Sequence, residues 1–135
     1  MIAVDTSALM AILLGEPTAD ACAEVLEAES DIVISAGTLA EALIVASRRN
    51  VATAMRQLIE DLGFQVIPLT EASAHRVAEI YGRWGKGRHP AGLNFGDCFA
   101  YDIATFYGCK LFYVGVDFSL TDVESASPNP ARGQE

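Results

Sequence analysis

The chain has 135 residues, of which 51% are hydrophobic and 20% charged, and its formal net charge is −9. This length supports one compact domain with a core of its own and leaves no room for a second domain. The negative charge argues against a general affinity of the whole surface for nucleic acids, so a polyanionic partner has to bind at a local basic patch. No apolar run reaches the roughly 18 residues of a membrane-spanning helix, and we expect a cytoplasmic protein with no membrane partner.

Short apolar segments alternate with amphipathic segments along the chain. The spacing of the apolar residues predicts four strands, at residues 2–4, 32–35, 65–68 and 111–114. It predicts helices between them, at residues 6–14, 18–29, 38–49, 51–62, 71–84 and 95–107. We expect Asn50 to cap the fourth helix and Gly63 to end it. Because strands separated by helices need crossover connections, the pattern predicts an α/β fold with a parallel sheet sandwiched between helices.

Residues 1–126 are assigned to a single domain, since they contain no internal repeat and no linker. The last segment, residues 127–135, is polar and interrupted by prolines. We expect this segment to be a flexible tail.

Four acidic residues lie beside predicted strand ends or alone in an apolar helix: Asp5, Glu41, Asp97 and Asp117. Carboxylates at strand ends can converge, because the carboxyl ends of parallel strands meet at one edge of the sheet. Two carboxylates about 4 Å apart repel by roughly 4 kcal/mol at an effective dielectric constant near 20. A helix N-terminus offsets only about 0.3–1 kcal/mol of this. A converged cluster therefore needs protons or a divalent cation, and oxygen ligands favour Mg²⁺ or Mn²⁺.

Three of these acids also suit ordinary structural roles. Asp5 can cap the helix that follows it, the spacing of Asn94 and Asp97 fits a capping box, and Asp117 suits a turn. Glu41 is harder to explain in this way, because its helix is apolar on nearly all sides and is predicted to be buried. A buried carboxylate is costly unless it is neutral, paired or bound to a metal. We therefore favour a metal-linked role for Glu41.

One basic segment, RWGKGRHP, interrupts the acidic chain. Arg83, Lys86 and Arg88 offer cations for phosphate groups, and Trp84 offers an indole on which a base can stack. This combination suits contact with single-stranded RNA. A solvated, flexible connection explains the segment equally well, because short basic runs are common.

Several segments together resemble one protein family. They are VDTSAL near the N-terminus, the lone Glu41 of the third helix, HPAGLNFGDCFAYDIA, and LFYVGVDFSLTD. They are similar to the PIN-domain endoribonucleases, in particular the VapC toxins of bacterial VapBC toxin–antitoxin pairs, and the resemblance extends to about Ala126. It implies a PIN fold with a four- or five-stranded parallel sheet. It also implies a site that uses Mg²⁺, with Mn²⁺ as a substitute, to hydrolyse RNA phosphodiester bonds.

The resemblance places the acidic metal site on Asp5, Glu41, Asp97 and Asp117. Asp5 and Asp97 would bind the metal directly, while Glu41 and Asp117 would hold the metal or its water molecules. The metal would lower the pKa of a bound water and shield the phosphate charge, so no histidine general base is required.

Four neighbouring residues bear on this assignment. Thr6 and Ser7 can orient a metal-bound water or a phosphate, although helix capping explains them equally well. Val116 departs from the family, in which a polar residue is usual at this position. Asp102 also departs from it, since alanine is more usual there, and we expect Asp102 at the surface or in an interface.

Partners follow from the same resemblance. It implies a VapB-type antitoxin whose C-terminal segment lies in the active-site cleft and presents an arginine to the acids. A carboxylate cluster suits such a partner electrostatically. The resemblance also implies a homodimer or a larger toxin–antitoxin assembly.

Two alternatives remain at this stage. The first is a phosphatase of the haloacid-dehalogenase type, because IAVDT resembles the nucleophile strand of that family and Gly96-Asp97 followed by Asp102 resembles its acidic motif. Against it, Ser7 stands where that family has a second Asp, and Asp97 lies at a predicted helix start. The second alternative is a catalytically decayed PIN interaction domain, in which Val116 marks the loss of the fourth position.

Overall fold

The computed structural model describes residues 1–127 of the chain. Its strands are β1 (Ile2–Val4), β2 (Ile32–Ser35), β3 (Gln65–Ile67) and β4 (Lys110–Phe112). They form one parallel sheet in the order β3-β2-β1-β4. The predicted α/β fold with a four-stranded parallel sheet is therefore confirmed.

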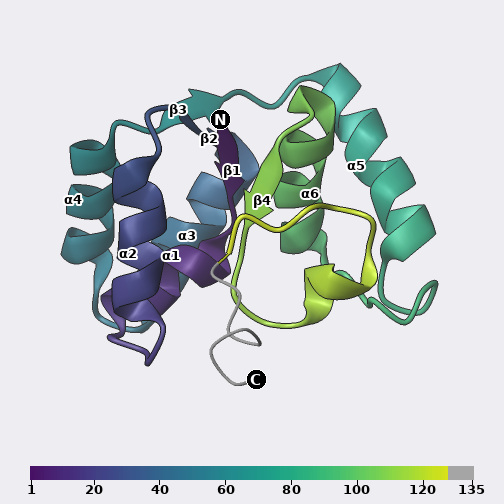
Figure 1. Cartoon of the computed structure of the whole chain (residues 1–135). Helices are drawn as coiled ribbons and strands as arrows, with labels where there is room; N and C mark the ends of the chain where they lie inside the picture. The colour runs from purple at the N-terminus through teal and green to yellow at the C-terminus, as the bar shows by residue number, and fades with distance from the viewer. Residues whose placement is uncertain (128–135) are drawn as a thin grey trace.

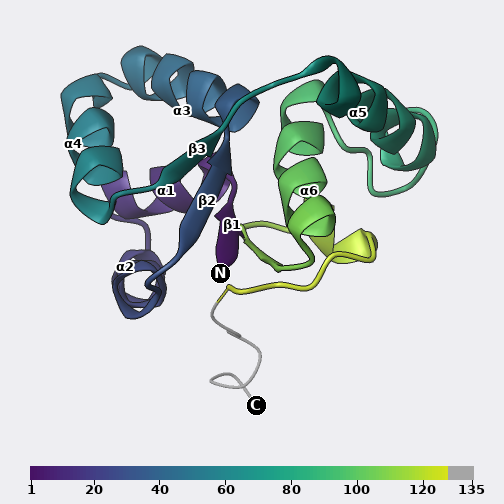
Figure 2. The same ribbon diagram turned by 90° about the horizontal axis from the view of Figure 1, so that it is seen from above.

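Helices cover both faces of this sheet. They are α1 (Thr6–Leu13), α2 (Ala19–Ala28), α3 (Ala36–Arg48), α4 (Ala52–Leu62), α5 (Glu71–Trp84) and α6 (Phe95–Tyr107), followed by the short 3₁₀ helix η1 (Asp117–Leu120). Helices α1 to α4 lie on one side of the sheet, and α5 and α6 lie on the other (Figure 1, Figure 2). This is the helix–sheet–helix layering that the alternating pattern predicts.

Strands β1, β2 and β4 each contribute to two cores, whereas the edge strand β3 is mostly exposed. Along β2, Ile32 and Ile34 pack into the core formed with α1 to α4, whereas Val33 packs into the core formed with α5 and α6. Successive side chains of a strand point to opposite faces. The strand positions that are covered on both faces are therefore apolar, and the polar strand residues Gln65 and Lys110 are exposed.

The connections place a topological switch point between β1 and β4. From β1 the chain crosses to β2 and then to β3 on one side, and it returns to β4 on the other side of β1. The N–H of Asp5 donates to the carbonyl of Phe112 over 2.9 Å, which continues the pairing just beyond the strand ends. In open parallel sheets, ligands bind at the carboxyl edge beside such a point.

The start of the fourth helix differs from the prediction. Val51 occupies the N-cap position of α4 and makes no side-chain cap hydrogen bond. Asn50 instead adopts a left-handed backbone with φ of 61° in the turn after α3, a conformation that asparagine tolerates better than most residues. The predicted stop is confirmed, because Gly63 ends α4 in the left-handed region.

The predicted burial of the third helix is wrong. Only Thr38, Ala42 and Ala46 of α3 are buried, and Ile44 is 55% exposed. The helix packs along one stripe only, because it lies in the outer layer and meets α1, α4 and α6 at its flanks.

Two other expectations concern the limits of the chain. The predicted tail at residues 127–135 lies outside the described residues except for Ser127, and the division into one domain and a tail stays a prediction. Among residues 1–127, the structure contains no helix with the length and hydropathy that a membrane span requires.

Candidate active site

Asp5 lies at the carboxyl end of β1, and its two carboxylate oxygens have different environments. Its Oδ2 caps α1 by accepting from the N–H of Ser7 over 3.0 Å and from the hydroxyl of Ser7 over 2.5 Å. Its Oδ1 is buried and has no hydrogen-bond partner within the part of the chain that the structure describes. The cap explains one oxygen, and the other remains available to a cation.

Asp97 enters the site at the start of α6. It forms a capping box with Asn94, in which the N–H of Asn94 donates to Asp97 Oδ2 over 3.0 Å and the N–H of Asp97 donates to Asn94 Oδ1 over 2.8 Å. The box holds the carboxyl in place at the helix N-terminus, where Asp97 is only 9% exposed. The capping role and a role in the site are therefore compatible.

Glu41 reaches the same place from α3. Its Oε1 accepts from the hydroxyl of Thr6 over 2.7 Å. Its carboxylate lies so close to Gly96 that a Cβ at that position would overlap Glu41 Oε2. Glu41 is partly exposed rather than buried, so the predicted burial is wrong, but its carboxylate lies between the first turns of α1 and α6.

Burial and mutual repulsion raise the pKa values of Asp5 and Asp97, the two most buried of the four acids. Burial is the main cause that raises the pKa of Asp5 to about 6, and the negative charge of Glu41 adds to it. Burial also raises the pKa of Asp97 to about 7, with contributions from the charges of Asp5, Asp117 and Glu41. All four predicted acids therefore interact at the carboxyl edge of the sheet.

Asp117 occupies the outer side of this cluster. It is the first residue of η1 and is exposed, but its charge raises the pKa of Asp97. The neighbouring Val116 is 73% exposed. An exposed valine leaves the approach to Asp117 open but offers no polar group beside it.

The hydroxyls of Thr6 and Ser7 are both used to hold carboxylates. Thr6 donates to Glu41, and Ser7 donates to Asp5 while its Oγ accepts from the N–H of Val114 over 3.0 Å. Ser7 thereby ties α1 to the segment after β4. Their predicted use on a metal-bound water or a phosphate is not tested by these contacts and stays a prediction.

The cluster fits a hard divalent cation, although it is not a preformed cage. Within residues 1–127, no three His, Cys, Asp or Glu side chains stand close enough together to hold a metal. Mg²⁺ does not require such a cage, because it keeps several waters and binds through one or two carboxylates. A bound cation would give the unpartnered Asp5 Oδ1 a partner. It would also stabilise the ionised form of Asp97, whose pKa is raised in its absence.

The basic segment, which begins in the last turn of α5 and continues into the connection to α6, presents only part of the predicted RNA contact. Arg83, Lys86 and Arg88 are exposed. Trp84 is only 8% exposed, and its Nε1–H donates to the hydroxyl of Tyr101 over 3.1 Å. The indole is part of the core, so its predicted role as a stacking platform does not suit this structure.

Asp102 is not at the surface, and this part of the prediction is wrong. It is 3% exposed and receives two hydrogen bonds from Arg76, from Nε over 2.6 Å and from Nη2 over 3.1 Å. Arg76 also lies over the ring of Phe106, 4.0 Å from its centroid. The pair joins α5 to α6. A buried aspartate is costly without a cation, and Arg76 supplies that cation.

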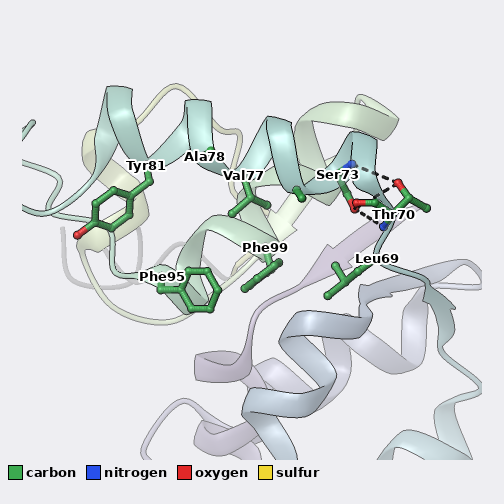
Figure 3. Close-up of a pocket in the computed structure, with 9 residues that line it drawn as sticks. Leu69, Thr70, Ser73, Val77, Ala78, Tyr81, Phe95 and Phe99 are labelled. Carbon is green, nitrogen blue, oxygen red and sulfur yellow. Dashed lines mark hydrogen bonds between the residues drawn. The ribbon is translucent and has the colours of Figure 1, made fainter.

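A groove of about 510 Å³ lies between α5 and α6 (Figure 3). Val77 and Tyr81 line it from α5, and Phe95 and Phe99 line it from α6. It lacks carboxylates, and Phe95 is 68% exposed at its edge, two residues before Asp97. The groove is therefore an apolar surface beside the acidic site and not part of its chemistry.

Comparison with known proteins identifies the class. The family model described as PIN domain matches residues 2–124. Ribonuclease VapC36 of Mycobacterium tuberculosis is 41% identical over 125 residues, which cover 90% of each chain. The chain therefore belongs to the PIN-domain family and, within it, to the VapC ribonucleases.

Solved structures agree on the fold. VapC20 of Mycobacterium tuberculosis, described as a sarcin-ricin loop cleaving toxin, superposes with a TM-score of 0.77 at 18% identity and covers 95% of this chain and 100% of its own. A toxin–antitoxin complex from Klebsiella pneumoniae gives a TM-score of 0.70 at 18% identity and covers 96% of this chain and 98% of its own. At this identity the likeness shows the PIN fold alone.

Some features of the site escaped prediction from sequence. The close approach of Gly96 to Glu41 was missed, although a glycine in the first turn of a helix is itself a signal of close backbone packing. The Ser7 bridge to Val114 joins residues that are 107 positions apart. No local sequence pattern predicts a contact between residues so far apart in the chain.

Proposed function

We propose that this chain is an Mg²⁺-dependent endoribonuclease toxin that hydrolyses RNA phosphodiester bonds, with Mn²⁺ as a substitute. The observation that supports this most directly is the buried, unpartnered Oδ1 of Asp5 in a group of interacting acids. An isolated carboxylate oxygen of this kind is costly unless a proton or a cation binds it. Membership of the VapC ribonucleases supports the choice of reaction. RNA lies in the cytoplasm, which is the location that this function requires.

The proposed roles follow the placement of the acids. Asp5 and Asp97 would bind the metal directly, and Glu41 and Asp117 would hold it or its waters. A bound divalent ion supplies a water of lowered pKa and neutralises charge on the phosphate. Asp5 and Asp97 are held by helix caps and Glu41 by Thr6, so these three carboxylates are already oriented before any ion binds.

Cations near the site are proposed to bind the RNA backbone. Arg83 is exposed in the last turn of α5, and Lys86 and Arg88 are exposed on the connection that leads into α6, whose first turn carries Asp97. Contacts to phosphates contribute affinity but do not distinguish one base sequence of the RNA from another. We expect neutralisation of these side chains to weaken RNA binding and to reduce its dependence on salt.

A VapB-type antitoxin is the proposed regulatory partner. The carboxylate cluster would attract a basic side chain of such a protein. The net charge of −9 also favours a basic partner for the protein as a whole. The similarity of the fold to the toxin–antitoxin complex from Klebsiella pneumoniae is consistent with this proposal. A homodimer or a larger toxin–antitoxin assembly is part of the same proposal.

The phosphatase alternative is wrong for this chain. Asp97 lies in the first turn of α6 and does not follow a strand, and the family match is to PIN domains over residues 2–124. A decayed PIN interaction domain remains the second candidate, because Val116 replaces a polar residue beside Asp117. That candidate predicts RNA binding without metal-dependent cleavage.

The deciding experiment is cleavage of end-labelled total RNA by the purified protein, free of antitoxin, with Mg²⁺ or with EDTA. Asp97→Asn is the test variant, because the amide oxygen can still accept from the N–H of Asn94 and keep the helix cap. Asp20→Asn is the matched control, since Asp20 is exposed at the start of α2. Discrete products that require both metal and Asp97 would support the proposal. Binding without cleavage would favour the decayed domain.

A further inference from the structure

The segment that carries Asp117 is held at both ends by residues next to the other acids. At its start, the N–H of Val114 donates to Ser7, whose hydroxyl donates to Asp5. At its end, the hydroxyl of Tyr101 donates to Asp122 Oδ1. Tyr101 lies one helical turn after Asp97 on α6, so the second attachment begins from the helix that carries Asp97.

Tyr101 is well suited to hold this attachment. It is 5% exposed, and its hydroxyl accepts from the Nε1–H of Trp84 while it donates to Asp122. The hydroxyl is thus fixed between a donor from α5 and an acceptor from the last described segment. Burial and the neighbouring Asp122 raise the pKa of Tyr101 to about 12, so the phenol keeps its proton at neutral pH.

Other contacts also hold the segment, at its middle and beyond its end, where the N–H of Leu111 donates to the carbonyl of Glu124 over 2.8 Å. Phe118 is 3% exposed and packs on Tyr113, which anchors the middle of the segment. The ion pair between Arg83 and Asp122 spans 3.7 Å between side chains that are 66% and 55% exposed, and exposed pairs of this kind contribute little. The hydrogen bond from Tyr101 is therefore the main polar restraint on Asp122.

We propose that Tyr101 and Asp122 are positioning residues that act on catalysis through Asp117. Their hydrogen bond fixes residues 115–122 so that the charge of Asp117 stays near the carboxylate of Asp97. Outer residues that orient the ligands of a metal site commonly affect activity in this way. The inference rests on the proposed function, because it assigns Asp117 to the nuclease site.

Tyr101→Phe tests the proposal, since it removes the hydroxyl and keeps the ring in the core. Thr105→Val is the matched control: it removes a hydroxyl from the same helix, where Thr105 Oγ1 donates to the carbonyl of Tyr101 over 3.0 Å. This hydroxyl donates only to carbonyls of α6 among the described residues and makes no hydrogen bond to residues 115–122. We expect Tyr101→Phe to slow Mg²⁺-dependent cleavage of end-labelled total RNA by about 10- to 100-fold. Asp122→Asn retains an acceptor for the tyrosine and should restore most of the rate relative to Asp122→Ala.

A double-mutant cycle separates positioning from a general loss of structure. If Tyr101 acts through Asp117, Tyr101→Phe adds no further loss to Asp117→Asn. Equal factors in the two backgrounds would overturn the proposal, because they would mean that Tyr101 acts independently of Asp117.

Hydrogen–deuterium exchange provides a readout that does not need activity. We expect Tyr101→Phe to speed exchange in residues 115–123 and Thr105→Val to leave it unchanged. Unchanged exchange in Tyr101→Phe would overturn the proposal even if cleavage fell. If the wild type cleaves no RNA, the proposed function fails, whereas the exchange experiment still decides whether Tyr101 holds the segment.

Discussion

The hydroxyl of Thr6 donates a 2.7 Å hydrogen bond to Oε1 of Glu41, and this contact links the first turn of α1 to α3. It places the carboxylate of Glu41 next to the helix that Asp5 caps. Glu41 raises the pKa of Asp5, so the two acids repel each other in the metal-free protein. The hydrogen bond from Thr6 offsets part of that repulsion and keeps Glu41 in the cluster.

Replacing Thr6 by valine should therefore reduce both activity and stability. The isosteric side chain keeps the packing but leaves Glu41 free to turn toward solvent, and we expect cleavage to fall by about 10-fold or more. The free energy of unfolding should fall by about 1–2 kcal/mol. RNA cleavage and urea denaturation measure the two effects. Thr6→Ser keeps the donor and should behave like the wild type, and a large loss in Thr6→Ser would contradict the role given to the hydroxyl.

Gly96 should resist substitution for a steric reason. A Cβ at this position would overlap Glu41 Oε2, so Gly96→Ala should displace Glu41 and lower metal-dependent cleavage. Gly82→Ala is the matched control, because Gly82 lies in α5 and an added Cβ there meets nothing within 4 Å. We expect Gly82→Ala to stabilise the protein by up to about 1 kcal/mol through helix propensity and to leave cleavage unchanged. Equal activity of the two variants would contradict the steric explanation.

The raised pKa values of Asp5 and Asp97 predict how the metal-free protein responds to pH. Both values, about 6 and about 7, lie above the ordinary aspartate value, so the folded state binds protons more tightly than the unfolded chain. Stability is then highest at low pH and is lost as pH rises through the two values, and each tenfold difference in proton affinity corresponds to about 1.4 kcal/mol. Denaturation in EDTA between pH 5 and pH 8 should show a falling free energy of unfolding.

Asp97→Asn provides the control for this titration. It removes the group with the higher pKa, so the decline near pH 7 should flatten and the metal-free variant should be more stable than the wild type at pH 8. Mg²⁺ should stabilise the wild type more at pH 8 than at pH 5, because it competes with protons for the same oxygens. A wild type whose stability rises between pH 5 and pH 8 in EDTA would contradict the prediction.

The parts of the site that were predictable from sequence depend on local features. Asp5 follows a short apolar strand, and Asp97 stands three residues after Asn94 at a helix start. Strand ends and helix caps are recognisable within a few residues. The parallel sheet then brings these ends to one edge, which is why their convergence followed from the element order.

The errors concern burial, which depends on partners far along the chain. Asp102 looked like a surface residue until Arg76, 26 positions earlier, supplied its cation. Trp84 looked available to RNA because its neighbours are basic, but Tyr101 accepts its N–H within the core. The helix around Glu41 looked buried from its composition, although it packs along one stripe only. Composition gives the apolar content of a helix but not the number of neighbours that cover it.

The pair of Arg76 and Asp102 leads to an asymmetric prediction for stability. The side chain of Asp102 is 4% exposed, whereas that of Arg76 is 31% exposed. Arg76→Ala leaves a buried carboxylate without its cation, and the loss of one partner of a buried pair costs about 3–5 kcal/mol. Asp102→Ala removes the buried charge itself, and the arginine it frees can reach solvent. We therefore expect Asp102→Ala to lose clearly less stability than Arg76→Ala in urea denaturation.

The double variant distinguishes this explanation from simple loss of packing. With both charges removed, the buried carboxylate no longer exists, so Arg76→Ala adds little to Asp102→Ala. Arg76 also packs over Phe106, and the part of its effect that comes from this contact should persist in the double variant. Equal losses for the two single variants, or additive losses in the double variant, would mean that packing and not the unpaired charge determines the cost.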